Sequence, residues 1–183
     1  MKHTFEIPTR NTVSTENQSI FDELENGLGF VPNLYATYAN SDTALADYLK
    51  LQNRKSSLKA KEREVINLVV SQINECDYCL AAHTAIAKMN GFTDDQILQI
   101  RTGEATFDPK LDALAKFTKE AVISRSKPGD KSVSQFLAAG YSSENLVDAI
   151  IVIGDKMISN FIYGTFKVPI DFPAAPALQP AVA

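Results

Sequence analysis

The chain has 183 residues, of which 45% are apolar and 22% charged, and its formal net charge is −4. This acidic balance argues against a dedicated nucleic-acid binder, which usually carries a basic patch or stripe. The longest uninterrupted apolar run, residues 149–153, is far shorter than the roughly 20 residues that span a bilayer. We therefore expect a soluble cytoplasmic protein built around one domain.

Helix signals recur along the chain, whereas strand signals are sparse. Ser14 or Thr15 can cap a first helix that Gly27 and Gly29 end, and Ser41 or Asp42 can cap a later one. Pro32 suits the first turn of the short helix between them. The longer helices are expected over residues 58–73, 76–89, 109–123, 133–139 and 146–166.

One local pattern occurs twice, at residues 91–97 and at residues 140–146. Each copy has a glycine, an aromatic residue, a hydroxyl residue and then acidic residues. This order suits the end of one helix and the capped start of the next. A true repeat of helical hairpins and two unrelated junctions with the same chemistry both explain it. Either way, the sequence predicts an all-α fold.

The stretch from Leu146 to Phe166 is the most apolar part of the chain, and its apolar face extends nearly all round the helix. Such a helix is expected to be buried, partly against another subunit. After it the chain turns to proline and alanine. The expected organisation is an N-terminal extension (residues 1–14), a helical domain (15–166) and a Pro/Ala-rich tail (167–183).

Three residues within a short segment suggest thiol chemistry: Cys76, Cys79 and His83. On a helix they lie within about 60° of one another. A helix N-terminus and a neighbouring imidazole both favour a thiolate. Cys-x-x-Cys spacing lets one sulfur resolve an oxidised form of the other, with His83 as proton shuttle.

Other interpretations of this segment remain open. The cysteines can be small buried apolar residues beside a core histidine. A zinc site would need a fourth ligand, and the other histidine, His3, lies near the N-terminus. A thioredoxin fold is disfavoured because no βαβ pattern flanks the pair.

The preceding helix offers two carboxylates that can orient the imidazole, Glu62 and Glu64. On the helical wheel Glu62 lies near the middle of the apolar stripe and Glu64 at its edge. Periodicity alone therefore favours Glu62 as the more buried carboxylate. Either residue can instead be a solvated glutamate of a first helical turn.

Several segments resemble the carboxymuconolactone decarboxylase superfamily, and more closely its alkylhydroperoxidase D (AhpD)-like branch. The spacing Glu-x11-Cys-x2-Cys-x3-His, from Glu64 to His83, matches the signature of that branch. The similarity continues in Phe30-Val31-Pro32-Asn33-Leu34-Tyr35 and Asp171-Phe172-Pro173, which resemble its peroxidase-related members. Most of residues 15–175 is covered.

This resemblance implies an all-helical fold that assembles as a homotrimer or homohexamer. It implies a peroxidase in which Cys79 attacks a hydroperoxide and becomes a sulfenic acid. Cys76 would donate a proton and then close a Cys76–Cys79 disulfide, while His83 and Glu64 complete a proton relay. A thiol partner protein would return the electrons. We find no motif for flavin, nicotinamide or haem, so we expect no cofactor and no metal.

The chain departs from the family at Tyr78, because the AhpD members place a histidine between the two cysteines. A phenol is a poor base at neutral pH, so peroxide turnover is expected to be weak or to use another substrate. The decarboxylase branch lacks the cysteine pair, which disfavours lactone decarboxylation. Two other functions stay open: a non-enzymatic oligomeric redox sensor, and an enzyme that uses Glu64 and His83 as acid and base.

Overall fold

Helix capping decides where most elements of this chain begin. In the computed structural model, which describes residues 5–178, Ser14, Thr93, Asp108 and Ser142 each accept a hydrogen bond from the backbone of the helix that they start. No strand occurs among the described residues, so the predicted all-α fold is confirmed. The elements are η1 (Arg10–Thr12), α1 (Thr15–Leu28), α2 (Asn33–Tyr38), α3 (Ala44–Gln52), α4 (Ala60–Ile73), α5 (Asp77–Met89), α6 (Asp94–Arg101), α7 (Pro109–Ile123), α8 (Asp130–Ala138) and α9 (Ser143–Phe166).

Several helices begin one to three residues away from the positions that the sequence suggested. The helix expected from residue 58 begins at Ala60, because the Glu62 carboxylate accepts the backbone N–H of Lys59 and caps the helix there. Thr43 rather than Ser41 or Asp42 stands at the N-cap of α3. The helix expected over residues 133–139 begins at Asp130, three residues earlier. These shifts leave the order of the helices unchanged.

The turn between α4 and α5 places the cysteine pair and has an unusual residue at its centre. The Cys76 N–H bonds the Ser71 carbonyl at 2.9 Å and the Glu75 N–H bonds the Gln72 carbonyl at 3.2 Å, the hydrogen bonds of a Schellman motif. This motif requires a left-handed residue, and Glu75 takes that conformation with φ of 51°. The turn after α5 has the same form with Gly91, whose φ is 84°. Only the second turn therefore has a sequence signal.

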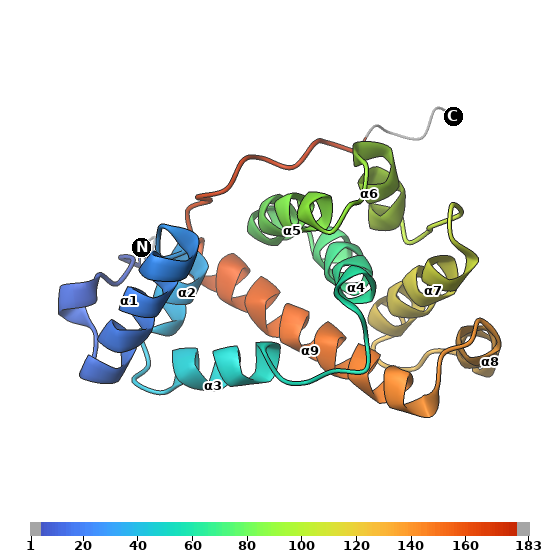
Figure 1. Ribbon diagram of the computed structural model, residues 1–183, viewed down its shortest axis with the longest axis horizontal. Helices are drawn as coiled ribbons and strands as arrows, with labels where there is room; N and C mark the ends of the chain where they lie inside the picture. Colours follow the sequence, from blue (N-terminus) through green and yellow to red (C-terminus); the bar gives the residue numbers. More distant parts are fainter. Residues whose placement is uncertain (1–4, 179–183) are drawn as a thin grey trace.

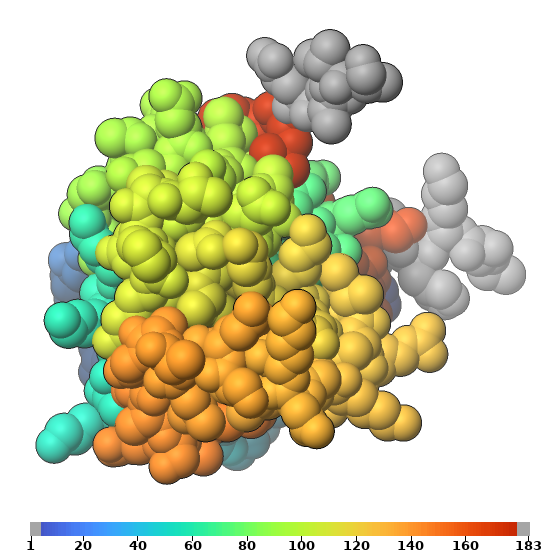
Figure 2. Space-filling view, turned by 90° about the vertical axis from the view of Figure 1, so that its right-hand side faces the viewer, coloured from blue at the N-terminus to red at the C-terminus, as the bar shows by residue number. Residues whose placement is uncertain are grey.

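Helix α4 is the centre of the molecule, with α5, α6, α7 and α9 packed around it (Figure 1). Its apolar residues belong to the larger hydrophobic core, which also includes side chains of α6 to α9. A second core joins α1, α2 and α3 to the start of α5 and to Val168. Figure 2 shows the side of the molecule on which α6, α7 and α8 lie. The cysteines belong to the second core, at its border with α4.

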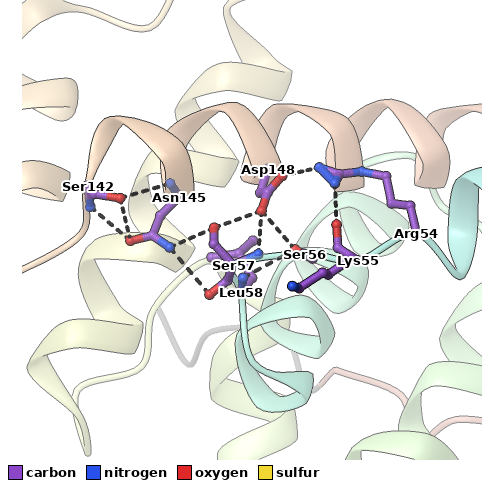
Figure 3. A network of polar contacts seen from close by, with 8 residues as sticks. All are labelled: Arg54, Lys55, Ser56, Ser57, Leu58, Ser142, Asn145 and Asp148. Carbon is purple, nitrogen blue, oxygen red and sulfur yellow. Dashed lines mark hydrogen bonds and ion pairs between the residues drawn. The ribbon is translucent and has the colours of Figure 1, made fainter.

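A polar junction fixes the first half of α9 against the loop before α4 (Figure 3). The Asp148 carboxylate accepts hydrogen bonds from the backbone N–H of Ser57 at 2.5 Å and from its hydroxyl at 2.7 Å. It also pairs with Arg54 and accepts from the Ser56 hydroxyl. Asn145 Nδ2 donates to the Ser57 hydroxyl at 2.9 Å. This buried carboxylate therefore ties two segments about 90 residues apart.

Helix α9 is less buried than its apolar sequence suggested. Ile150 and Phe161 are 55% and 67% exposed, and Val147 and Ile158 are also exposed. Isolated apolar residues on a surface are common, but these four share one long helix. Assembly into a trimer or hexamer stays a prediction. Within residues 5–178, no helix combines the length and apolar character needed to cross a membrane.

The segment after α9 runs back past α5 to α6 (Figure 1). Asn33 donates to it twice, from its backbone N–H to Asp171 at 2.6 Å and from its side chain to the Pro169 carbonyl at 3.1 Å. Further along, Arg101 Nη1 donates to the Pro176 carbonyl at 2.5 Å. The segment therefore lies fixed on the body of the protein. His3 lies outside the described residues.

Candidate functional site

Helices α4 and α5 bring Glu64 and His83 into direct contact. Nδ1 of His83 lies 2.7 Å from Oε2 of Glu64, and both side chains are buried. Asn67, one turn further along α4, donates to the other oxygen of Glu64 at 2.9 Å. Glu62 is equally buried but caps its own helix and lies 3.7 Å from Lys110. The helical wheel favours Glu62, but the partner of His83 is Glu64, so that prediction is wrong.

The charge of Glu64 determines which nitrogen of His83 carries a proton. Burial opposes ionisation, but the contacts with His83 and Asn67 keep the pKa of Glu64 below its ordinary value. An ionised carboxylate only accepts hydrogen bonds, so Nδ1 of His83 must donate. Nε2 is then the basic nitrogen of the ring. This arrangement can take a proton and stabilise the resulting imidazolium.

The two cysteines occupy different positions at the start of α5. Cys76 is the N-cap residue, and its sulfur accepts the backbone N–H of Cys79 at 3.3 Å. Cys79 lies in the first turn, where unpaired N–H groups and the helix dipole favour negative charge. Each side chain is the main cause of the pKa shift of the other. Both are free thiols, and Cys76 and Cys79 are only 1% and 2% exposed.

The surroundings of the pair favour a thiolate on Cys79 and a thiol on Cys76. A hydrogen bond from Cys76 lowers the pKa of Cys79; burial opposes this, and the positive charges of Lys156 and His83 lower it further, to about 6. Asn160 Nδ2 also donates to the Cys79 sulfur at 3.1 Å. The same bond to Cys79, together with burial, raises the pKa of Cys76 far above its ordinary value. One sulfur is thus prepared as a nucleophile and the other as its proton donor.

We expect the ultraviolet absorbance of the Cys79 thiolate to disappear with a midpoint near pH 6 as the pH falls. Because the pKa is lowered, the thiolate is present above this midpoint, including at neutral pH, whereas an ordinary thiol titrates at about 8.5. The measurement is a difference titration against the Cys79→Ser protein. A midpoint at the ordinary value would contradict the assignment of Cys79 as the activated thiol.

Two variants of Cys76 separate the causes of this shift. Serine keeps both the helix cap and a donor to Cys79, so Cys76→Ser is expected to leave the midpoint low. Alanine has neither group, so Cys76→Ala is expected to move the midpoint upward. A midpoint that stays low in both variants would show that Lys156, His83 and Asn160 suffice.

The side chain of Tyr78, the residue between the cysteines, points into the second core rather than toward the two thiols. Its hydroxyl accepts the backbone N–H of Leu34 at 3.2 Å. Its ring packs edge-on against Phe172, with ring centroids 5.6 Å apart. Burial raises the pKa of this phenol well above its ordinary value. Tyr78 therefore joins α5 to α2 and to the C-terminal segment.

A cavity of about 480 Å³ lies beside Cys79 and His83. Aromatic and aliphatic side chains supply much of its wall, from α1, α2, α3, α5, α9 and the C-terminal segment. Polar groups line it as well, among them Glu64, Asp155 and Lys156. Its volume is in the range of small-molecule sites. The four residues singled out from the sequence thus lie together, with Cys79, His83 and Glu64 on the wall of one cavity.

The sequence did not identify the contributions of α9 and of the asparagines. Asn160 contacts the Cys79 sulfur, and Asn74 Nδ2 donates to the side-chain oxygen Oδ1 of Asn160 at 2.8 Å. Asp155, Lys156 and Asn160 interrupt the most apolar helix of the chain, and all three are buried. Polar residues in a helix that is otherwise apolar are the signal that indicates a site there.

Comparison with known proteins identifies relatives of this chain. The model of the carboxymuconolactone decarboxylase family matches residues 38–120, a range that contains Glu64 and both cysteines but not α9. YdfG of Bacillus subtilis is 28% identical over 102 residues, which are 55% of this chain and 69% of YdfG.

Solved structures share the fold over most of the chain. An alkylhydroperoxidase AhpD core, the peroxidase-related protein of Ralstonia eutropha JMP134, superposes with a TM-score of 0.82 at 20% identity, covering 91% of each chain. A peroxidase-related protein of Silicibacter sp. TM1040 gives 0.80 at 23% identity, covering 91% of this chain and 90% of its own. A cysteine-to-alanine variant of the debrominase Bmp8, in complex with 2,3,4-tribromopyrrole, gives 0.75 at 15% identity and 92% of each chain. At these identities the likeness concerns the fold.

Proposed function

Because this chain belongs to the carboxymuconolactone decarboxylase superfamily and has the fold of its AhpD-like members, we propose that it acts as a thiol-dependent peroxidase. The observation that carries the proposal is the unequal pair of thiols, of which Cys79 lies on the cavity wall. Cys79 has a lowered pKa and Cys76 a raised one, and the Cys76 sulfur accepts the backbone N–H of Cys79. In such a pair one sulfur attacks the substrate, and the other sulfur then forms a disulfide with the oxidised one.

In the first step the Cys79 thiolate attacks the terminal oxygen of a hydroperoxide. An S–O bond forms, the O–O bond breaks, and the leaving alkoxide takes a proton from Cys76 or from the His83 imidazolium. The products are an alcohol and a Cys79 sulfenic acid. Glu64 holds the ring through Nδ1 and stabilises its charged form.

In the second step Cys76 attacks the Cys79 sulfur. An S–S bond forms, the S–O bond breaks, and the departing hydroxide leaves as water after it takes a proton. A dithiol or a thiol partner protein then reduces the disulfide and is itself oxidised, which restores both cysteines. No cofactor enters this cycle, since the electrons come from thiols.

The test is steady-state reduction of an organic hydroperoxide with dithiothreitol as electron donor, beside the Cys79→Ser protein. Repeated turnover that disappears in the variant is the expected result. A protein that oxidises once to the disulfide and stops would instead be a redox sensor, the non-enzymatic alternative. Turnover that survives the loss of both thiols would indicate acid–base chemistry by Glu64 and His83.

A second candidate reaction is reductive dehalogenation of a small aromatic compound. The aromatic wall of the cavity favours it, since Tyr35, Tyr48, Tyr78 and Phe172 all contribute, and the debrominase Bmp8 shares the fold. In this reaction two thiols become a disulfide while a carbon–halogen bond is replaced by carbon–hydrogen and a halide leaves. Halide release from a brominated pyrrole or phenol, measured with the same thiol donor, separates the two activities.

A further inference from the structure

The face of α9 that lines the cavity carries two buried charges. Asp155 is 7% and Lys156 is 2% exposed, and both lie on the cavity wall. Oδ1 of Asp155 is buried and has no hydrogen-bond partner within residues 5–178. Lys156 forms no ion pair with a carboxylate of that part of the chain, although its ammonium is not among the buried atoms that lack a hydrogen-bond partner. A buried charged group without a partner is costly and points to a ligand that supplies one.

The two charges influence different groups on the cavity wall. Lys156 lowers the pKa of both Glu64 and Cys79, so it acts on the thiol side. Asp155 acts on the tyrosines of α2 and α3: burial and this carboxylate raise the pKa of Tyr35 to about 12. The cavity wall therefore carries both the reactive Cys79 and the acidic Asp155.

The hydroxyl and amide groups around Asp155 form hydrogen bonds with one another. The Tyr35 hydroxyl donates to Gln52 Oε1 at 2.6 Å, and Gln52 Nε2 donates to the Tyr48 hydroxyl at 3.2 Å. The Tyr48 and Ser159 hydroxyls lie 2.5 Å apart and share a hydrogen bond. This chain of contacts ends without reaching Asp155 Oδ1. No donor within residues 5–178 reaches that oxygen, which leaves it free to accept a hydrogen bond from a ligand.

We propose that Asp155 and the tyrosines beside it form a substrate subsite that binds a hydrogen-bond donor, a hydroxyl or a protonated amine, on an arylalkyl hydroperoxide. The inference rests on the proposed peroxidase function and names its substrate class. The hydroperoxide lies at Cys79, the aromatic body lies against the aromatic wall, and the donor meets Asp155. A substrate with a carboxylate at the same place meets the Asp155 carboxylate and is rejected.

The test uses cumene hydroperoxide and three para-substituted forms that carry an aminomethyl, a hydroxymethyl or a carboxyl group. We expect KM to be lowest for the aminomethyl and hydroxymethyl forms, with a preference over the unsubstituted compound of about ten-fold. The carboxyl form is expected to be the poorest substrate. Equal KM values for the unsubstituted and donor-bearing forms would overturn the proposal.

Two variants identify the group responsible. Asp155→Ala removes the acceptor, so both preferences are expected to disappear. Asp155→Asn keeps an acceptor oxygen and removes the charge, so the preference for the hydroxymethyl form should remain while that for the aminomethyl form falls. Circular dichroism and thermal melting show whether each variant folds. A preference that persists in a folded Asp155→Ala protein would place the subsite elsewhere.

A binding measurement keeps this inference separate from the peroxidase proposal. The four corresponding alcohols are titrated into the Cys79→Ser protein by calorimetry, which needs no turnover. Tighter binding of the donor-bearing alcohols that is lost in Cys79→Ser/Asp155→Ala supports the subsite, even where no hydroperoxide is reduced. Equal binding of all four alcohols would refute the subsite, whatever the turnover.

Discussion

Replacement of Cys76 by serine is expected to convert repeated turnover into a single one. Serine keeps the helix cap and a donor to Cys79, so the first step is preserved, but it has no sulfur with which to form a disulfide. One equivalent of hydroperoxide is consumed rapidly, and Cys79 then remains a sulfenic acid. A stopped-flow burst of one equivalent, followed by mass spectrometry and trapping with dimedone, measures this.

The Cys79→Ser protein is the matched control, because it carries the same substitution on the other sulfur. It is expected to show neither the burst nor a trapped sulfenic acid at Cys76. If Cys76 is trapped in that protein while Cys76→Ser is inert, the roles of the two cysteines are reversed. Continued turnover in Cys76→Ser with dithiothreitol would show that an external thiol resolves Cys79 directly.

Replacement of Glu64 by glutamine is expected to lower kcat/KM for hydroperoxide about 10²-fold, a loss typical of impaired proton transfer. A glutamine has one acceptor and one donor end, so it holds either tautomer of His83 and no longer stabilises the imidazolium. The measurement is the pH profile of kcat/KM for wild type and variant. The volume of the side chain is nearly unchanged, so the fold is expected to persist.

Glu62→Gln is the control for this change, since Glu62 is equally buried on the same helix and does not contact His83. It is expected to affect thermal stability through the cap of α4 more than kcat/KM. Comparable losses of kcat/KM in both variants would mean that disturbance of α4, rather than the hydrogen bond to His83, explains the effect.

Much of the fold is predicted from the sequence because local residue signals mark the ends of the helices. Ser14, Gly29, Gly91 and Pro109 stand at helix ends where their backbone preferences place them. Glu75 has no such preference, yet it takes the left-handed position before Cys76. Packing of α4 against α5 imposes that conformation, and a single residue does not reveal it.

The candidate site likewise combines residues that the sequence predicts with residues that it does not reveal. Glu64, Cys76, Cys79 and His83 lie within one helical hairpin, so spacing along the chain is enough to bring them together. Asn160 meets Cys79 from 81 residues away, and this contact depends on how α9 crosses α4 and α5. Pairings of that kind follow from tertiary packing, which periodicity does not specify. The motif spacing of the family selects Glu64 over Glu62 because that spacing reflects how the helices pack. The helical wheel indicates only which residues are expected to be buried.

The distance along the chain between Cys79 and Asn160 also has a consequence during protein synthesis. The Glu64–His83 contact spans only 19 residues and can form as soon as α5 is made. The 81 residues that separate Cys79 from Asn160 take about 4 to 16 seconds to add at typical elongation rates. Throughout that interval the nascent chain lacks a complete α9, which later buries the pair. The newly made cysteines are therefore accessible to oxidants and to wrong disulfide partners until α9 is complete.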